Sequence, residues 1–369
     1  MKQDKDREGD WQALDNYRNE IDRIDEKILP LLRRRQEVAA SIGKLKDDLG
    51  LDIFNPAREL EVVRRLSSQN TKNLPPDAVR HIFSEIISAA RAVQGPFKAA
   101  FLGPEATFTH QAAISLFGRS TLFRAADSIE EVFGLVEKGV CSQGVVPIEN
   151  SYEGAVNSTL DLLYKFELKI GAEIFLRIRH HLLSRIGDIK ELKQLYSHPM
   201  AIAQCRSWIK KNLPAISIKE TESTSLAAEM ACEEPFAAAI AGRLSGLTYD
   251  LPILRENIED HPDNVTRFLV IGKNDSEPTG KDKTSILFSL SHRPGALYRV
   301  LKALAEKGIN MTRIESRPMK RRNWEYLFFV DLEGHEQEEN LHKAITEMEG
   351  QCDFMKRLGS YPTGGDPWD

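Results

Sequence analysis

The sequence predicts a multidomain chain in which an all-α unit is followed by an α/β unit and a small α+β unit. Apolar residues recur at heptad spacing near the N-terminus, short apolar runs alternate with helical stretches from residue 98, and strand and helix patterns alternate again after residue 283. A length of 369 residues fits two or three domains, and an apolar share of 41% suffices for ordinary cores. We expect the units to span 11–95, 98–272 and 284–362, with a polar linker at 273–283.

A long amphipathic helix is predicted at the start of the first unit. Arg35 alone interrupts its apolar face, and an isolated Arg there either meets an anion, reaches the edge of the seam or pairs with a structural Glu. Pro30 costs about 3 kcal/mol inside a helix, but the pattern keeps its phase across it, so we expect a kink and no break. Two heptad rows make up this face: Leu14, Ile21, Ile28, Arg35 and Ile42, and Tyr17, Ile24, Leu31, Val38 and Leu45.

The spacing of three cations along this helix predicts a dimer. Lys46 lies roughly 20° around the helix from Arg35 and about 16 Å along it, so both point to the same side. Arg18 lies about 25 Å from Arg35 and roughly 100° off that face. One helix cannot bring Arg18 and Arg35 to one small anion, but an antiparallel helix from a second chain can. We therefore expect an intertwined homodimer or a higher homo-oligomer.

The polar residues of this unit carry a family resemblance. The segment 18–94, with its two spaced arginines, a lysine, an Arg-Glu pair and a glutamine, resembles the all-helical chorismate mutases. In that family two arginines, one from each chain, bind the carboxylates of chorismate, while a Lys and a Gln hydrogen-bond the ether oxygen that breaks. The resemblance assigns these catalytic roles to Arg18, Arg35, Lys46 and Gln94. Supporting contacts fall to Arg58 and to Glu59, the latter toward the substrate hydroxyl.

The chemistry implied by this resemblance suits such a site. A [3,3] rearrangement needs no nucleophile and no proton transfer, only a folded near-attack conformer and positive charge beside the developing ether oxygen. The sequence departs from the family at two positions. Asn55, which we retain as a candidate for substrate binding, stands where the family often has Asp, and Ala90 stands where it often has Ser. We expect these two departures to weaken hydroxyl or carboxylate contacts to the substrate. The charged residues of the family pattern are all present.

Composition excludes several classes of function. The net charge is −5, and 50 basic residues are interspersed with 55 acidic ones, which argues against a nucleic-acid partner. No stretch approaches 18 apolar residues and the N-terminus has no apolar signal region, so we expect neither export nor a membrane partner. The chain shows no metal-ligand cluster or dinucleotide fingerprint, so we expect no metal and no cofactor. Reduced thiols of a cytoplasmic protein are expected at Cys141, Cys205, Cys232 and Cys352.

Three strand-to-helix junctions in the second unit are rich in small and hydroxyl residues, at 102–113, 146–156 and 196–205. Backbone N–H groups at helix starts attract carboxylates, although such residues are often only turns and caps. Together with 221–228 and 261–272, these junctions resemble prephenate dehydratase over residues 98–272. The resemblance implies two α/β lobes around a cleft, similar in form to periplasmic binding proteins.

The reaction of that family removes water and CO₂ from prephenate to give phenylpyruvate. Its Thr-Arg-Phe signature falls on Thr266, Arg267 and Phe268, and the Thr is the family's essential residue. We expect Thr266 to be a positioned hydrogen-bond donor at the ring hydroxyl, with Glu149 and His198 as titratable alternatives. Arg267 either binds the side-chain carboxylate or only snorkels. The further candidates for substrate binding are Thr107, Thr109, Asn150, Ser151 and Phe268.

The third unit reads as βαββαβ, a ferredoxin-like pattern that includes a strand at 324–332. Its segments 295–297 and 315–318 resemble the ACT-type amino-acid-binding domain. On the residues alone, these segments can also be a helix-start turn and a strand stop. The resemblance implies a Phe site, facing the same elements of a second chain, built from Gly295, Ala296, Leu297, Glu315, Ser316, Arg317 and Pro318.

The resemblances together imply a bifunctional enzyme of phenylalanine biosynthesis. It would rearrange chorismate to prephenate, convert prephenate to phenylpyruvate, and respond to L-phenylalanine as an effector. Two alternatives remain: an arogenate dehydratase, which would use the amino analogue of prephenate, and a non-catalytic amino-acid sensor. The set of Arg18, Arg35, Lys46 and Thr266 speaks against the sensor.

Overall fold

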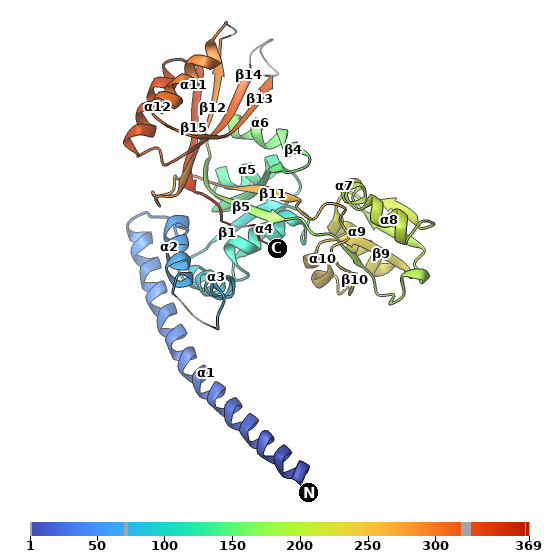
Figure 1. The fold of residues 1–369 in the computed structure, drawn as a ribbon. Coiled ribbons are helices and arrows are strands. Elements are labelled where there is room, and N and C mark those ends of the chain that lie inside the picture. Colours follow the sequence, from blue (N-terminus) through green and yellow to red (C-terminus); the bar gives the residue numbers. More distant parts are fainter. Residues whose placement is uncertain (1, 70–72, 292, 319–325, 366, 369) are drawn as a thin grey trace.

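A computed structural model describes residues 2–69, 73–291, 293–318, 326–365 and 367–368. The three units follow one another along the chain, and the long first helix projects away from the other two (Figure 1). No helix among these residues is long and apolar enough to cross a membrane. The same residues contain no group of three His, Cys, Asp or Glu side chains that could hold a metal ion.

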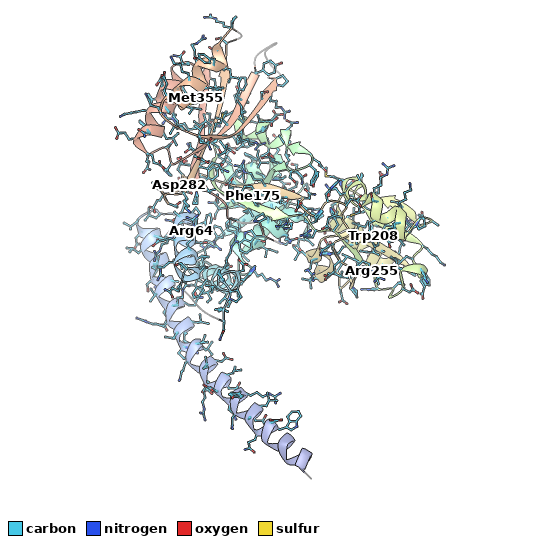
Figure 2. The ribbon with its side chains drawn as sticks, viewed as in Figure 1. Arg64, Phe175, Trp208, Arg255, Asp282 and Met355 are labelled. Atoms are coloured by element: carbon cyan, nitrogen blue, oxygen red, sulfur yellow. The ribbon has the colours of Figure 1, made fainter. Side chains whose placement is uncertain are left out.

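The first unit consists of α1 (Lys2–Asp48), α2 (Pro56–Ser67) and α3 (Pro76–Ala92). Helix α1 continues through Pro30, as expected from the unbroken phase of its apolar rows. Near its C-terminal end, α1 packs closely against the residues that follow α3. A Cβ atom on Gly43 would lie only 2.4 Å from the carbonyl oxygen of Gln94. The rest of α1 projects into solvent (Figure 2), and its apolar rows are exposed.

The first lobe of the second unit is a mixed sheet in the order β2-β1-β3-β11-β5, with the short β4 paired to β3. Apolar clusters cover both faces, beneath α4 (Phe108–Phe117) on one side and beneath α5 (Ile129–Glu137) and α6 (Asn157–Lys165) on the other. The strands are β1 (Lys98–Leu102), β2 (Leu122–Ala126), β3 (Gln143–Asn150), β4 (Gly154–Ala155), β5 (Lys169–Arg177) and β11 (Val265–Gly272).

The second lobe has its own sheet, in the order β10-β6-β9-β7-β8. The chain enters this lobe after β5 and returns to the first lobe at β11, so two crossings join the lobes. Its strands are β6 (His181–Leu183), β7 (Gln194–Ser197), β8 (Ser217–Glu220), β9 (Ala237–Ala241) and β10 (Ile253–Arg255). Its helices are η1 (Ile189–Glu191), α7 (Pro199–Gln204), α8 (Arg206–Asn212), α9 (Thr224–Glu233) and α10 (Arg243–Thr248).

The third unit is a four-stranded antiparallel sheet in the order β13-β14-β12-β15. Two helices cover one face, and the other face packs on the first lobe through Leu287, Leu327, Phe329 and Leu358. Of the strand expected at 324–332, the first two residues lie outside the described part. The elements are β12 (Asp282–Leu290), α11 (Ala296–Glu306), β13 (Met311–Pro318), β14 (Tyr326–Glu333), α12 (Glu339–Glu349) and β15 (Phe354–Pro362).

Strand β12 begins two residues inside the segment expected to be a linker. The carboxylate of Asp282 accepts hydrogen bonds from the backbone N–H groups of Thr279 (2.7 Å) and Gly280 (2.9 Å), which closes a turn directly before the strand. After β15 the tail runs back to the first lobe, where the N–H of Trp368 donates to the carbonyl of Phe175 (2.9 Å). The indole of Trp368 lies 3.6 Å below the guanidinium of Arg80 in α3.

Candidate active sites

A cleft of about 270 Å³ lies between the two lobes of the second unit. The first lobe contributes Thr107, Thr109, Asn150, Thr266 and Phe268, all of which were selected from the sequence. Across the cleft stand His198, Gln204 and Glu222 with the start of α9. The strand-to-helix junctions that looked unspecific one by one therefore meet at one place.

Thr266 is fixed in this cleft by an amide network. Its Oγ1 accepts a hydrogen bond from Asn150 Nδ2 at 2.8 Å, and the same nitrogen donates to Asn264 Oδ1 at 2.8 Å. Asn150 Oδ1 in turn accepts from the backbone N–H groups of Tyr152 (2.9 Å) and Glu153 (3.2 Å). Because its oxygen holds these two donors, the side chain of Asn150 must present its NH₂ group to Thr266. The hydroxyl hydrogen of Thr266 is then available to a group in the cleft.

Helices α4 and α9 both start at this cleft. Thr107 caps α4, since its Oγ1 accepts from His110 N (3.4 Å) and donates to the carbonyl of Leu102 (3.1 Å). Ser223 caps α9 by accepting from Leu226 N (3.0 Å). The hydroxyl of Thr107 is therefore committed to the cap, and what α4 and α9 offer an anionic ligand is the positive end of each helix dipole.

His180 and Gln204 also border the cleft, although sequence reasoning did not select them. The ring of His180 is almost fully buried, packs edge-on against Phe108 and lies 2.8 Å from Gln204 Oε1 through Nε2. Burial lowers the pKa of His180, so the ring is neutral at pH 7. The adjacent His180 and His181, at the start of β6, were a signal in the sequence that could have pointed to this site. His198 instead caps α7, with Nδ1 accepting from Met200 N (3.2 Å), which leaves its Nε2 to carry the proton.

Arg267 does not face the cleft, contrary to the expectation that it binds a substrate carboxylate. Its guanidinium is buried and reaches Glu173 Oε2 (2.7 Å), Asp331 Oδ2 (2.6 Å) and the hydroxyl of Tyr361 (3.0 Å). Successive residues of a strand point to opposite faces, so Thr266 on the cleft side sends Arg267 to the other side. Arg267 is therefore part of the contact between the first lobe and the third unit.

Two other residues expected at the cleft lie outside its lining. Glu149 faces the third unit, where Oε2 lies 3.3 Å from Arg313 and 3.9 Å from Arg267, so it is not a proton donor to a ligand in the cleft. Alternation along β3 explains this, because Asn150 takes the cleft side. Ser151 is exposed, and its hydroxyl accepts from Val265 N at 3.1 Å, which braces the strand that carries Thr266.

The polar set of the helical unit is assembled in part. Arg35 donates to the carbonyl of Ile86 (3.3 Å), and Lys46 donates to that of Ile53 (2.8 Å). Burial lowers the pKa of both cations, and the carboxylate of Glu59 opposes that shift in each case, so the three side chains share one electrostatic environment. Gln94 lies beside Gly43 of α1.

The remaining members of this set point elsewhere in the single chain. Arg58 is exposed and pairs with Glu61 at 2.6 Å. Asn55 caps α2, where its Oδ1 accepts from Arg58 N at 2.9 Å. Arg18 pairs only with its helix neighbour Asp15 at 3.2 Å within the described residues, and its side chain is 63% exposed.

Glu59 has a partner that sequence reasoning missed. Arg91 Nη1 donates to both of its oxygens, at 2.9 Å and 3.0 Å. Burial raises the pKa of Glu59, while the charges of Arg91, Lys46 and Arg35 lower it in that order. No spacing rule links residues 59 and 91, which lie on different helices.

The expected effector segments lie at the outer part of the third unit. Gly295 adopts φ +77° directly before α11, so its backbone alone requires glycine. Ala296 is buried, and Leu297 packs against the helix-covered core. Glu315 and Arg317 share the β13 face that is turned to the first lobe, whereas Ser316 and Pro318 are exposed on the opposite face. Arg317 pairs with Asp161 of α6 at 2.8 Å.

Comparison with protein families assigns the three units. Residues 17–95 match the model of chorismate mutase type II, residues 99–276 that of prephenate dehydratase, and residues 284–350 that of the ACT domain. The second unit is thus the dehydratase domain and the first is the mutase domain. Both assignments confirm the identities expected from the sequence.

Two individual proteins support this assignment by their similarity to the chain. The bifunctional chorismate mutase/prephenate dehydratase of Aquifex aeolicus (strain VF5) is 48% identical over 355 residues, covering 95% of this chain and 98% of the relative. The structure of prephenate dehydratase from Arthrobacter aurescens in complex with L-Phe has a TM-score of 0.67 at 33% identity and covers 72% of this chain and 90% of that one.

A third similarity shows that the fold does not fix the reaction. The structure of GqqA, described as a novel type of quorum quenching acylase, also has a TM-score of 0.67, at 29% identity, and covers 72% of this chain and 98% of that one. The high identity to the Aquifex relative spans all three units, whereas GqqA matches only part of the chain. The extent of that identity and the order of the three family models show that this chain belongs to the family of bifunctional chorismate mutase/prephenate dehydratases.

Proposed function

We propose that this chain catalyses two successive reactions, the rearrangement of chorismate to prephenate in residues 11–95 and the conversion of prephenate to phenylpyruvate in residues 98–272. A regulatory unit at 284–362 follows the expected linker at 273–283, whose last two residues already belong to β12. The observation that carries the proposal is the hydroxyl of Thr266, held by Asn150 in a cleft between two lobes and left free to donate. We also assign the two lobes to the periplasmic-binding-protein type and the third unit to the ferredoxin-like type, supported by the strand orders.

The dehydratase step needs help mainly at the leaving hydroxyl. As the C–C bond to the ring carboxylate breaks, its electron pair enters the ring, CO₂ departs, and the C–O bond to the hydroxyl breaks with uptake of one proton to form water. Thr266 donates a hydrogen bond to that oxygen and stabilises the charge that develops there. Phe268 and Ile178 border the cleft with apolar surface, which favours a carboxylate that is losing its charge. The starts of α4 and α9 hold the remaining carboxylate.

The mutase step needs a compact conformer of chorismate with positive charge beside the ether oxygen. Arg35 and Lys46 supply that charge from one chain. Gln94 is a further hydrogen-bond donor, and Glu59 accepts a hydrogen bond from the substrate hydroxyl. Arg58 and Asn55 contribute only if a bound substrate draws them from their present partners. Arg18 is too far along α1 to join this group from the same chain.

A homodimer completes the mutase site in this proposal. The exposed face of α1 supports it: Tyr17 is 66% exposed and Leu31 is 71% exposed, and both belong to the apolar rows. A helix with such a stripe is stable in water when another helix covers it. An antiparallel α1 from a second chain would cover the rows and bring its Arg18 to Arg35. Of the three alternatives for the half-buried Arg35, this proposal selects the anion, which is the substrate carboxylate.

Regulation by L-phenylalanine is the third part of the proposal. The ligand would lie between β13 and the start of α11 of two chains, near Ser316 and Gly295. The opposite face of β13 carries Arg313 and Arg317, which pair with Glu149 and Asp161 of the dehydratase domain. Glu149 directly precedes Asn150, the residue that orients Thr266. A shift of β13 on effector binding therefore has a direct physical route to the cleft.

Two alternatives differ in substrate and in class. An arogenate dehydratase would carry the same Thr266 network, and a non-catalytic sensor would use the cleft and the ACT unit for binding alone. The hydrogen bond from Asn150 to Thr266 favours catalysis over binding alone. So does the placement of Arg35 and Lys46 beside Glu59. The cytoplasmic location expected from four free cysteines remains part of the proposal.

The test is to give the purified full-length protein chorismate, prephenate and arogenate in separate assays. The proposal expects prephenate from the first, phenylpyruvate from the second and a slower release of phenylalanine from the third. Faster turnover of arogenate would identify an arogenate dehydratase. Binding of the compounds without turnover of any of them would identify a sensor.

A further inference from the structure

Arg91 is a buried cation at the contact between the mutase and dehydratase domains. It belongs to α3 of the mutase domain and is only 1% exposed. Its Nη1 donates to both oxygens of Glu59, and its Nη2 donates to the backbone carbonyl of Phe117 at 2.5 Å. One guanidinium therefore joins a predicted mutase residue to the last residue of a dehydratase helix.

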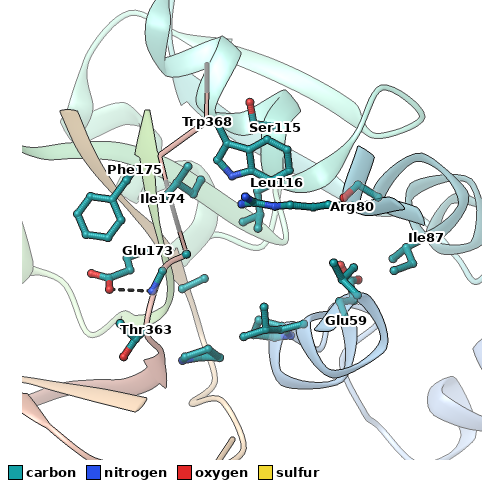
Figure 3. A pocket seen from close by; sticks show the side chains of 18 of the residues that line it. Glu59, Arg80, Ile87, Ser115, Leu116, Glu173, Ile174, Phe175, Thr363 and Trp368 are labelled. Carbon is teal, nitrogen blue, oxygen red and sulfur yellow. Dashed lines mark hydrogen bonds between the residues drawn. The ribbon is translucent and has the colours of Figure 1, made fainter. Parts of the chain in front are cut away.

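Aromatic side chains confine this guanidinium from several directions. Its carbon lies 5.4 Å, 5.0 Å and 5.4 Å from the ring centroids of Phe54, Phe97 and Phe117. The three rings also contact one another, with centroids 5.1 to 5.9 Å apart. Cation–π attraction and the lack of free space leave Arg91 little freedom to choose another position. Its single carboxylate partner within the described residues is Glu59, which borders a cavity of about 110 Å³ at this contact (Figure 3).

The dehydratase side of the contact is equally tight. Gly118, which follows Phe117, has φ +68°, and an added Cβ would lie 2.5 Å from Cβ of Ser88 in α3. Ser120 N donates to Ser88 Oγ at 3.2 Å. Because α4 ends at Phe117 and begins at the prephenate cleft, one helix about 15 Å long has the cleft at one end and Arg91 at the other.

We propose that Arg91 is a positioning residue for the mutase reaction: it holds the carboxylate of Glu59 ready for the substrate hydroxyl, and the dehydratase domain holds Arg91 in place. The inference rests on the proposed role of Glu59 in binding that hydroxyl. It adds a residue that touches neither substrate and makes the mutase site dependent on the neighbouring domain of the same chain.

The electrostatics give this role a measurable sign. Burial raises the pKa of Glu59, and Arg91 is the strongest of the three cations that lower it. A protonated Glu59 is a neutral carboxyl group and accepts a hydrogen bond from the substrate hydroxyl less strongly than the carboxylate does. Mutase activity should therefore fall as the pH drops through the pKa of Glu59. Weakening Arg91 raises the pKa further and moves the acid limb of the profile to higher pH. Lys46 and Arg35, which also face Glu59, keep the direction of the shift unchanged.

The experiment compares mutase kcat and KM across pH, without phenylalanine, for the full-length wild type and the variants Arg91→Met, Arg91→Lys, Gly118→Ala and Arg80→Met. Arg91→Met should lower kcat/KM by up to about 100-fold and move the acid limb upward. Arg91→Lys keeps a charge but cannot serve both acceptors, so its effect should be smaller and in the same direction. Gly118→Ala disturbs the contact from the dehydratase side and should shift the limb without touching Glu59.

Arg80→Met is the control, since Arg80 also lies in α3 and its guanidinium stacks on Trp368 of the C-terminal tail, away from Phe117. It should leave the mutase profile unchanged. Unaltered acid limbs in Arg91→Lys and Gly118→Ala would overturn the proposal even if Arg91→Met fails to fold. A Glu59→Gln variant separates the two levels: if Glu59→Gln impairs the mutase while the Arg91 variants do not, only this inference fails. Full mutase activity in Glu59→Gln would remove the underlying role of Glu59.

Discussion

The dehydratase domain contacts both the mutase domain and the regulatory unit, and these two contacts are built differently. Toward the mutase domain, one cation, Arg91, sits among three aromatic rings and holds a residue of a predicted active site. Toward the regulatory unit, Arg267 and Lys283 both pair with Glu173, and Arg267 also pairs with Asp331. The first contact positions a catalytic group, whereas the second joins a regulatory sheet to the strand that carries Thr266. We therefore expect damage to the first to change basal mutase activity and damage to the second to change regulation and stability.

Thr266→Val should produce the largest change in activity, because it removes a group of the dehydratase site itself. Both domain contacts stay intact. Valine keeps the volume but removes the hydroxyl, so dehydratase turnover should fall by about 10²–10⁴-fold. Chorismate rearrangement should be nearly untouched. Parallel assays with chorismate and prephenate measure both reactions. Loss of both activities together would mean that the two sites are not separate, and retained dehydratase activity would exclude Thr266 from the mechanism.

Glu173→Gln tests the charged contact with the regulatory unit through stability. The side chain of Glu173 is fully buried and accepts from Arg267, from Lys283 (2.9 Å) and from the N–H of Gly364 (2.9 Å). Removing its charge leaves two buried cations without their shared partner, so the free energy of unfolding should fall by about 3–5 kcal/mol.

The control for this prediction is Glu61→Gln, which breaks an exposed pair with Arg58. That variant should cost no more than about 0.5 kcal/mol. The midpoints of urea unfolding give both values. Equal effects of the two substitutions would contradict the distinction between a buried charge cluster and a surface pair.

A contact between chains extends the comparison to the mutase site. Inactive Arg18→Ala and Arg35→Ala proteins, when mixed and allowed to exchange, should recover up to about a quarter of wild-type mutase activity, because half of the dimers then contain one complete site. The mutase rate after mixing is the measurement. If both arginines of a site come from the same chain, mixing will restore nothing.

Asp331→Asn tests whether the regulatory contact carries the effector response. Asparagine keeps the shape but weakens the pairing with Arg267, which directly follows Thr266. Phenylalanine should still bind by calorimetry, but its effect on prephenate affinity should shrink from a coupling of roughly 1–3 kcal/mol toward zero. The exposed Lys343→Gln in α12 serves as a control with normal inhibition. A full response to phenylalanine in Asp331→Asn would show that the pair of Asp331 and Arg267 does not carry the response.

The two contacts also show what the sequence could and could not predict. The long helix and the α/β pattern followed from period and composition, whereas the two lobes and the place of Thr266 followed from the family resemblance. The true direction of Arg267 was already implicit in strand alternation, since Thr266 and Arg267 cannot face the same side. Arg91 was not accessible in this way, because its partners Glu59 and Phe117 belong to different elements and only the packed domains bring them together.

The most direct test of the difference between the two contacts is to compare Arg91→Lys with Asp331→Asn in one pair of measurements. The first is the pH profile of the mutase without phenylalanine, and the second is inhibition of the dehydratase by phenylalanine. Arg91→Lys should shift the acid limb of the mutase to higher pH and keep the inhibition, while Asp331→Asn should keep the mutase profile and lose most of the inhibition. If either variant changes both properties to the same extent, the two contacts do not have separate roles.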